Sequence, residues 1–496
     1  MKLKIYTTII ILALNFNLAF SQNVNYVPSS AKAVLSFNIN SVINKLGKNY
    51  REIIRDVIRN SGGKVDYRDG QKIEKLINSL DLEEDVRIIL HGMSKDFNNI
   101  DISAVIPYRN VSQLKEVIYE IFEDSYIRNY FSGNIEYFEI DDTTVMAIGN
   151  NVLCFSYSAS GTYVAYSYLN EIVGNKSPLR DKTFLELEKK VNDMALWIDS
   201  DYIYRIGLLE EGYSMYNNMF YKSSYGASLN FNQGYVILEI EQYFPKNPFG
   251  QIKKKINSKV AQLVDTYNIL GFFSVSFSPR KFNEMVKNNF AYTEIDRELR
   301  NEIANGMTGY DLIDMFGGDC SGIVVNDNGN PTFVAAASIN NQTKFINYLL
   351  ENDNYIIRTG NNEYWGESGD ANFYVSDSTI YICDSTLTLN RLRSILNNRS
   401  NSDNYSKFAF NNDASFFFNI DKSYKLFREG SELDILVNEL HYISGSVNIE
   451  NNNSVKTVMR LNFKNTNQNS LATLIDILSR MSYWECFLNN ISKINL

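Results

Sequence analysis

Histidine is almost absent from this sequence, which limits the kinds of catalysis that the chain can support. Only His91 and His441 occur among the 496 residues, and a Ser/His/Asp or Cys/His triad needs one of them as its base. His91 lies where one apolar strand run ends and His441 where another begins, and neither stands beside a nucleophile motif. We therefore expect structural or exposed roles for both histidines.

Cysteine is also scarce, and its spacing excludes the common metal sites. The four cysteines are far apart and form no CxxC or Cys/His pattern, so no metal is predicted. Cys154 and Cys383 each lie in a β-type run, where a buried small hydrophobe is favoured over a disulfide. An exported protein can oxidise its thiols, so the disulfide state stays open for the whole set: Cys154, Cys320, Cys383 and Cys486.

Motifs for nucleophilic catalysis and cofactor binding are missing as well. The chain has no G-x-S-x-G, no P-loop and no G-x-G-x-x-G behind a strand. Three acidic clusters have the residue type that glycoside hydrolysis needs, namely Glu83-Glu84-Asp85, Asp141-Asp142 and Glu210-Glu211. Each stands where a turn or a solvated loop is expected. We therefore predict no catalytic, cofactor-binding or metal-ligating residue and no cofactor.

The N-terminus carries the one long apolar run, and it has the form of a signal peptide. Lys2 and Lys4 form a basic start, residues 5–18 are apolar, and Ala19-Phe20-Ser21 is a small-x-small cleavage site. Residues 1–21 are therefore predicted to be removed after Ser21. The alternative is an uncleaved anchor helix, which is disfavoured because the run is short for a membrane span and is interrupted by two asparagines, Asn15 and Asn17.

The mature chain is acidic, which excludes two classes of partner. Without the two N-terminal lysines it has 46 basic against 57 acidic residues, a net charge of −11. Nucleic acid and anionic membrane surfaces both need a basic face. No later apolar run reaches membrane-spanning length. We expect an exported protein without a membrane span, located in the periplasm, at the outer surface or outside the cell.

A strand followed by an amphipathic helix, at residues 33–47 (AVLSFNINSVINKLG), is the recurring unit of the chain. Similar stretches occur at 271–285 (GFFSVSFSPRKFNEM) and 415–427 (SFFFNIDKSYKLF). Apolar residues at spacings of three and four continue from Val42 to Ile58, which predicts one long helix there. The same reasoning predicts further helices at 71–80, 111–122, 162–172 and 470–481, and strands at 86–90, 102–107, 137–140, 145–148, 152–157, 194–198, 226–231 and 235–244.

The order of these patterns begins again after residue 248. Residues 33–40 match 271–278 at a shift of 238, and 102–114 match 333–345 at a shift of 231. The shift then falls to 227 for the strands after Glu136, to 221 for Trp197 and Phe418, and to 218 for Leu229 and Val447. A steadily declining shift indicates tandem copies that differ by loop deletions. Two unrelated α+β domains that share generic patterns remain the alternative.

These patterns predict an α+β protein made of two tandem related modules. Each module is expected to be a mainly antiparallel sheet with helices packed on one face. The predicted boundaries are 22–248 for the first module, 249–469 for the second, and 470–496 for a C-terminal helix and tail.

Several stretches together resemble an uncharacterised family, classed as a domain of unknown function, of secreted proteins typical of the Bacteroidota. They are Tyr26-Val27-Pro28, the strand–helix unit at 33–47, Leu80-Asp81-Leu82, and Phe316-Gly317-Gly318-Asp319 before a hairpin. The first copy has no counterpart of the last motif. The resemblance covers most of the mature chain and implies export and an α+β fold, and it brings no catalytic residue.

One aromatic segment is the candidate partner surface. Exposed aromatic rings suit stacking on sugars or packing on a protein, although three of these residues have helical spacing and could instead cover the sheet. The segment comprises Tyr213, Tyr216, Phe220, Tyr221 and Tyr225. The leading functional hypothesis is a non-enzymatic binding or scaffold protein with a protein or glycan partner. The alternatives are a secreted carboxylate-dependent hydrolase and a periplasmic folding or assembly factor.

Overall fold

The chain is an α+β protein that folds as two compact units. The computed structural model describes residues 26–47, 52, 67–95, 98–122, 127–174, 176–190, 192–205, 222–245, 250, 252–286, 297, 315–351, 355–368, 371–398, 405–426, 433–450 and 453–480. The first unit comprises the described residues up to Arg205, those from 222 to 243, and those from Thr466 onward. The second comprises the described residues between Phe244 and Asn465.

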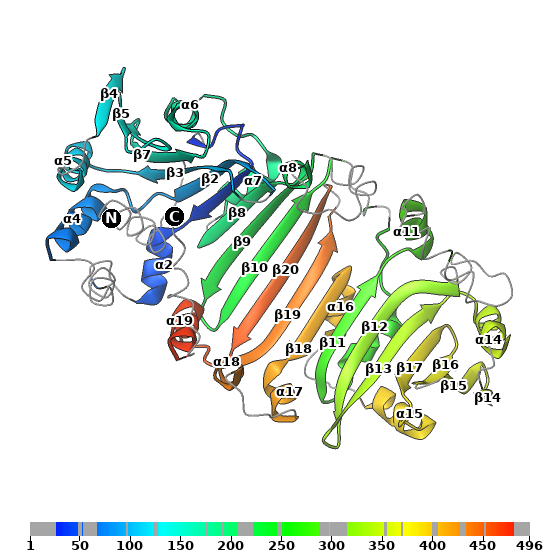
Figure 1. Cartoon of the computed structure of the whole chain (residues 1–496). Coiled ribbons are helices and arrows are strands. Elements are labelled where there is room, and N and C mark those ends of the chain that lie inside the picture. Colours follow the sequence, from blue (N-terminus) through cyan, green and yellow to red (C-terminus); the bar gives the residue numbers. More distant parts are fainter. Residues whose placement is uncertain are drawn as a thin grey trace. The chain divides into compact units, whose positions relative to one another are not determined.

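The first unit is built on a ten-stranded antiparallel sheet. Its strands pair in the order β4-β5-β6-β7-β3-β2-β1-β8-β9-β10 (Figure 1). They are β1 (Ala33–Phe37), β2 (Val86–Met93), β3 (Ile100–Pro107), β4 (Arg128–Ser132), β5 (Ile135–Glu139), β6 (Thr144–Gly149), β7 (Val152–Ser158), β8 (Met194–Asp199), β9 (Ser224–Asn232) and β10 (Tyr235–Tyr243). Its helices are α2 (Ile39–Leu46), α4 (Tyr67–Ser79), α5 (Val111–Ile121), α6 (Thr162–Val173), α7 (Lys182–Glu188), α8 (Ser200–Arg205) and α19 (Ser470–Arg480).

The second unit contains ten further antiparallel strands of the described chain, and we refer to these ten as the second sheet. Its strands pair in the order β14-β15-β16-β17-β13-β12-β11-β18-β19-β20. They are β11 (Ile269–Ser276), β12 (Phe316–Asp327), β13 (Asn330–Ile339), β14 (Tyr355–Gly360), β15 (Glu363–Ser368), β16 (Ala371–Ser376), β17 (Thr379–Asp384), β18 (Ala414–Asn419), β19 (Leu440–Ile449) and β20 (Ser454–Phe463). Its helical segments are α10 (Ser258–Gln262), η3 (Leu263–Asp265), α11 (Pro279–Val286), α14 (Gln342–Glu351), α15 (Leu389–Asn397), α16 (Tyr405–Phe410), α17 (Ile420–Leu426) and α18 (Leu433–Glu439).

Helices cover both faces of the first sheet, so the prediction of helices on one face is wrong. Strand β6 shows the reason, because its apolar residues do not alternate with polar ones. Val145 and Ala147 pack into a core with α6 and α7, whereas Met146 and Ile148 pack into a second core with α2, α4 and α5. A strand that is apolar on both sides needs cover on both faces.

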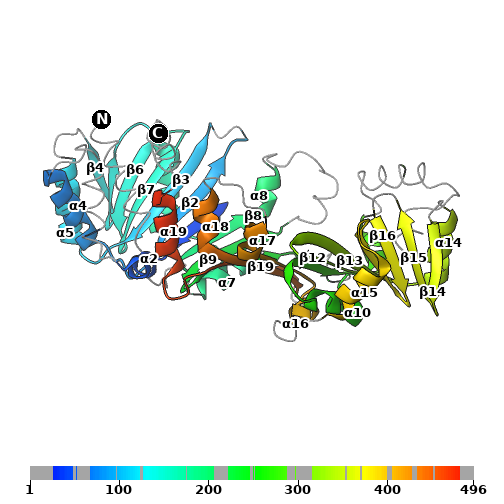
Figure 2. The ribbon, with the colours of Figure 1, turned by 90° about the horizontal axis from the view of Figure 1, so that it is seen from below.

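The second unit also has a core on each face of its sheet, but the cover on one face is partial. One core contains Phe272, Ile323 and Phe417 and is closed by α10, η3, α15 and α16. Figure 2 shows α10 and α16 on one side of β12 and β19. The other core lies under α14 and extends over β13, β16 and β17, where it includes Phe373 and Val375.

The long helix predicted from Val42 to Ile58 does not form as one piece. Helix α2 ends at Leu46, because Gly47 takes a left-handed conformation (φ 66°) and donates its N–H to the Asn44 carbonyl. Glycine adopts this conformation without steric cost and so commonly ends helices. Most of the remaining stretch lies outside the described residues. At the other end, the Asn38 side chain caps α2 by accepting the Ser41 N–H at 2.9 Å.

Candidate functional site

A broad apolar surface lies on the second sheet, on the side opposite α10 and α16. Strand registers align three neighbouring rows of side chains that cross β20, β19, β18, β11, β12 and β13. On β17 the middle row continues to Ile382, and the row through Ala337 reaches Ile380, which is buried in the core under α14. We call this surface the open face. The middle row is Met459, Gly445, Phe416, Phe273, Gly322, Ala335 and Ile382. The flanking rows are Leu461, Ile443, Phe418, Gly271, Val324 and Phe333, and Thr457, Val447, Ala414, Val275, Cys320 and Ala337.

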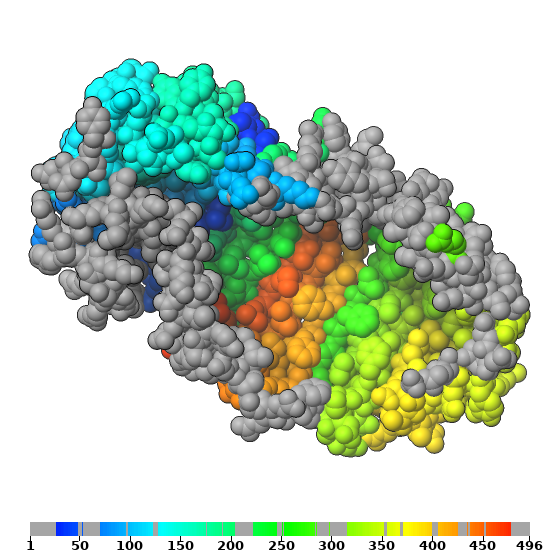
Figure 3. Space-filling model, viewed as in Figure 1, coloured from blue at the N-terminus to red at the C-terminus, as the bar shows by residue number. Residues whose placement is uncertain are grey.

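Four large side chains of the open face are strongly exposed. The exposed fractions are 42% for Phe273, 43% for Phe333, 43% for Phe418 and 41% for Ile382. Their sequence neighbours point to the opposite side of the sheet and are buried there, with Phe272 at 5% and Phe417 at 7%. Figure 3 shows this side of the second unit, where atoms of β18, β11 and β12 form the visible surface.

Glycines on neighbouring strands give the phenylalanine rings room to lie against the sheet. A side chain at Gly322 would collide with the Phe273 ring, and one at Gly445 would collide with the Phe416 ring. Gly271 makes the same kind of close approach to Phe418. The rings therefore rest over the glycine positions, and the middle of the open face is an aromatic platform.

The open face has almost no chemical groups for polar recognition or catalysis. Thr457 is the one hydroxyl and Cys320 the one thiol among its side chains, and burial raises the pKa of that thiol. The surface can therefore contribute apolar burial, at about 25 cal/mol for each Å² removed from water. Sheets that face water normally carry polar residues on that side.

Of the five residues in the aromatic segment, Tyr225 lies among the described residues. Tyr213, Tyr216, Phe220 and Tyr221 lie outside the described residues. Tyr225 lies on β9 in the first unit, half-buried, and its register partners are Ile198 and Gln242. The proposed partner surface at this segment stays a prediction.

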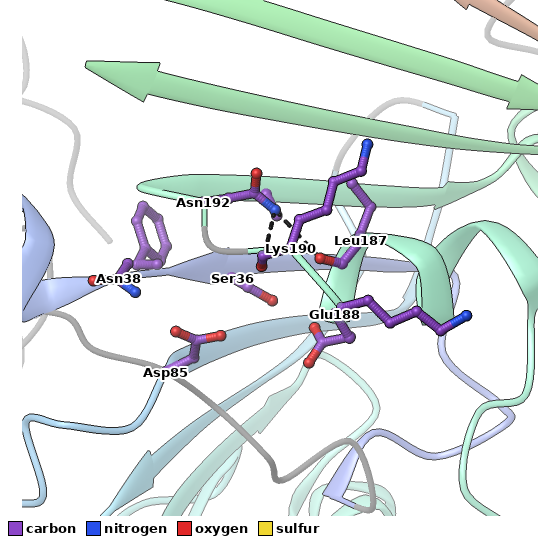
Figure 4. A pocket seen from close by; sticks show the side chains of 10 residues that line it. Ser36, Asn38, Asp85, Leu187, Glu188, Lys190 and Asn192 are labelled. Carbon is purple, nitrogen blue, oxygen red and sulfur yellow. Dashed lines mark hydrogen bonds between the residues drawn. The ribbon is translucent and has the colours of Figure 1, made fainter. Parts of the chain in front are cut away.

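Asp85, from one of the acidic clusters named from the sequence, lines a small pocket in the first unit. Asp85 and Glu188 face each other across it, with Ser36 between them (Figure 4). The Arg87 Nη2 atom lies 2.6 Å from a Glu188 oxygen and 3.9 Å from an Asp85 oxygen. Desolvation by burial raises the pKa of Asp85 to about 7, and the nearby Glu188 charge adds to the rise while Arg87 opposes it.

The size of this pocket argues against a substrate. Its volume is about 70 Å³, whereas pockets for small ligands usually measure several hundred Å³. A few water molecules would fill it. The other acidic clusters give no site either: Asp141 accepts hydrogen bonds from the N–H groups of Thr143 and Thr144 in a turn, and Glu210-Glu211 lies outside the described residues.

His91 is buried and held in a polar network. Its Nε2 lies 2.8 Å from the Ser103 hydroxyl, and its ring stacks on Tyr168 at 3.9 Å. Desolvation lowers the pKa of His91 to about 4, with the Asp101 charge opposing the change. Asp101 is occupied by hydroxyl donors from Ser158 and Tyr168, so it does not complete a triad. His441 is exposed on β19.

Cysteine and metal chemistry give no further site among the described residues. Cys154 and Cys383 are buried, as their strand positions predicted, and burial raises the pKa of Cys383 to about 11. No group of three or more His, Cys, Asp or Glu side chains in the described chain is placed to hold a metal ion. No helix in the same part of the chain is long and apolar enough to cross a bilayer.

Comparisons with known proteins add no identification. No family model and no curated protein matches the sequence. Crystal form I of a protein named TP0453 is 15% identical over 50% of this chain and 86% of its own, with a TM-score of 0.28. Crystal form III of TP0453 is 14% identical over 49% and 84%, with a TM-score of 0.29. Likeness at this level supports no argument about function.

Sequence reasoning missed the open face, although a signal for it was present. Phe272-Phe273 and Phe416-Phe417-Phe418 are runs of aromatic residues inside strands. Successive side chains of a strand point to opposite faces, so such a run must place rings on both sides of its sheet. Only the pairing of β11 with β18 shows that Phe273 and Phe416 then lie side by side.

Proposed function

We propose that this protein is an exported, non-enzymatic binding protein of the cell envelope or extracellular space, and that the open face is its binding surface. The observation that carries the proposal is the strong exposure of Phe273, Phe333, Phe418 and Ile382 on one continuous apolar surface. Contiguous apolar patches on soluble proteins mark interaction sites. Polar side chains at these positions would keep the sheet soluble, so the aromatic residues favour a partner that covers them.

The sequence supports export independently of the surface. Residues 1–21 have the basic, apolar and small-x-small pattern of a cleaved signal peptide. The resemblance to a secreted family of the Bacteroidota remains a prediction and points in the same direction. The location in the periplasm, at the outer surface or outside the cell is part of this proposal.

We further propose that the two units are tandem copies of one module. The strand order of the second unit repeats that of the first, with β11 to β20 in place of β1 to β10. In both units the third and seventh strands pair, and the first strand lies between the second and the eighth. Two unrelated folds would not be expected to share an order with these crossovers.

Strand registers support the same proposal quantitatively. Val34 pairs with Ile89 and Trp197, and Phe272, its counterpart at the shift of 238, pairs with Ile323 and Phe417. The same comparison can be extended to the strands on either side of these pairs. It makes Ser103 equivalent to Val334 (shift 231), Ser156 to Cys383 (shift 227) and Gly226 to Ser444 (shift 218). These are the shifts found by sequence comparison. For Trp197 the register gives Phe417, one residue before the Phe418 expected from sequence.

A periplasmic folding or assembly factor is the second candidate function, favoured by the same exposed apolar surface. Such a factor would bind unfolded chains transiently, whereas a dedicated binding protein would hold one folded partner. Among the described residues, the Asp85 and Glu188 pair is what supports the hydrolase alternative, and their pocket of about 70 Å³ disfavours a sugar substrate.

Site-specific photo-cross-linking in the native host tests the binding proposal. We expect p-benzoyl-phenylalanine at position 273 to give one discrete adduct with a partner. The same probe at Tyr355 should give none, because Tyr355 is 64% exposed but lies on the far edge strand β14 of the same sheet. Equal adduct yields at both positions, or none at position 273, would contradict the proposal. A broad smear of adducts at position 273 would favour the folding factor.

A further inference from the structure

The dimensions of the open face match one α-helix. The face spans seven strands that lie about 4.8 Å apart, which gives a length of about 29 Å. Its three rows are separated by two residues along each strand, which gives a width of about 13 Å. A helix is about 10–12 Å wide with its side chains and rises about 1.5 Å per residue, so about 20 residues would cover the face.

The first unit shows what occupies the same positions of its own sheet. Leu35 lies between Ile88 and Leu196 on β2 and β8, just as Phe273 lies between Gly322 and Phe416 on β12 and β18. Leu35 and Ile88 belong to the core that amphipathic helices of the chain close, with Val42 and Ile43 from α2, Leu76 and Leu80 from α4, and Leu114 and Val117 from α5. Helices are therefore the natural cover for this side of the module.

In the described part of the second unit this cover is partial, because large apolar side chains of its central strands stay exposed. Helix α14 closes the core at β13, β16 and β17, which ends near Ile380. Helices α17 and α18 contact β19 and stand on the side away from α10 and α16 (Figure 2). Helix α17 also contacts β11, and α11 contacts β12. Phe273 and Phe418 nevertheless stay more than 40% exposed.

We propose that the open face binds an amphipathic α-helix from a partner polypeptide, with a length of about 20 residues set by the rise of a helix. This inference rests on the proposed binding function and names the partner. The face offers about 400 Å² in plan, from the length and width above, whereas a stable dimer usually buries about 800 Å² on each partner. A single helix therefore fits better than a second copy of the chain. The net charge of −11 of the mature chain favours a helix with a basic polar side and disfavours an anionic membrane surface.

Fluorescence anisotropy with the mature full-length chain tests this inference. The probe is a labelled peptide of Leu, Lys and Glu with leucines at i, i+3, i+4 and i+7, long enough to form a helix that covers the face, and the control peptide has the same composition in scrambled order. We expect the amphipathic peptide to bind at least tenfold more tightly than the scrambled one. The double variant Phe273→Asp/Phe418→Asp should lose at least tenfold in affinity, and Tyr355→Asp should bind like the wild type.

A second variant changes the shape of the open face while keeping the face apolar and the protein folded. Gly322→Val adds apolar area and β propensity but displaces the Phe273 ring, and we expect weaker peptide binding with an unchanged circular dichroism spectrum. Equal binding of the two peptides, or binding that both face variants leave unchanged, would overturn the helix assignment. If sedimentation showed that the wild type is a dimer and that Phe273→Asp/Phe418→Asp is a monomer, the occupant of the open face would be a second copy of the chain, and the helix assignment would be overturned. Cross-links at position 273 without helix binding would leave the binding function standing and refute the helix.

Discussion

Burial and partners set the charge of individual carboxylates in this protein, and Asp85 is the clearest case. Arg87 contacts Glu188 at 2.6 Å and lies 3.9 Å from Asp85, so it compensates Asp85 less well. Desolvation then dominates and raises the pKa of Asp85 from 3.8 to about 7. This environment could not be predicted from Glu83-Glu84-Asp85, because Glu188 comes from α7, far along the chain.

Replacing Asp85 with asparagine should change how stability depends on pH. Below about pH 4 Asp85 carries a proton in both the folded and the unfolded state, and between about pH 4 and pH 7 only the folded protein keeps it. The free energy of unfolding therefore falls as the pH rises from about 4 to about 7, and the loss is complete above about pH 7. Asp85→Asn does not titrate, and its free energy of unfolding should therefore rise relative to wild type by a few kcal/mol from pH 4.5 to pH 8, at about 1.4 kcal/mol per pKa unit. Urea unfolding at several pH values measures this difference.

An exposed acid provides the control for this measurement. Asp142 lies in a turn of the first unit and is exposed, and Asp142→Asn should give a curve parallel to that of the wild type. A parallel curve for Asp85→Asn as well would show that Asp85 is ionised normally in the folded protein.

At the scale of elements, much of the secondary structure could be predicted from periodicity. The patterns at 111–122 and 162–172 correspond to α5 and α6 within one residue at their ends. The turn between β12 and β13 has Asn328 and Gly329 at positive φ, which is the conformation that an Asn-Gly pair favours in a hairpin. The two-sided cover of each sheet was missed, because the period of a strand says which residues share a face and not what packs on it.

One local arrangement recurs in both units and was also invisible in the sequence. Asp193, before β8, accepts the Phe231 N–H at 2.5 Å and binds Lys45 at 2.6 Å. Asp413, before β18, accepts the Ile449 N–H at 2.7 Å and has Lys253 at 3.4 Å. Each is preceded by an asparagine that accepts a hydrogen bond from an asparagine on the next strand, Asn192 from Asn230 and Asn412 from Asn448. Asn-Asp alone is too short a pattern to identify such a contact.

These two aspartates should differ in their contribution to stability. Asp193→Ala leaves the buried Phe231 N–H and the close Lys45 ammonium without their acceptor, and we expect a loss of about 2–4 kcal/mol in the first unit. Asp413→Ala should cost about 1–2 kcal/mol in the second unit, because Lys253 is farther away and 46% exposed. Urea unfolding, monitored by hydrogen exchange of β9 for the first unit and of β19 for the second, measures both losses. Equal losses would contradict this assignment.

At the scale of the whole molecule, the chain returns to its first unit at the end. Gly234, in the turn between β9 and β10, donates its N–H to the Gln468 carbonyl at 2.9 Å. The Asn469 amide donates to the Phe231 carbonyl at 3.3 Å. Helix α19 then contacts α2, β9 and β10. Periodicity predicted this helix almost to the residue, but it could not predict the docking partner, because the whole second unit separates the two in sequence.

Helix α19 should therefore stabilise the first unit and not the second, which precedes it in sequence. Ile477 is 1% exposed on α19, and Ile477→Ala should cost about 2–4 kcal/mol because it opens a cavity in packed surroundings. Hydrogen exchange should become faster in α2, β9 and β10 and stay unchanged in β12 and β13. Ile475→Ala on the same helix is the matched control, since Ile475 is 40% exposed and its loss should leave exchange unchanged. Faster exchange in β12 and β13 with Ile477→Ala would show instead that the two units unfold as one.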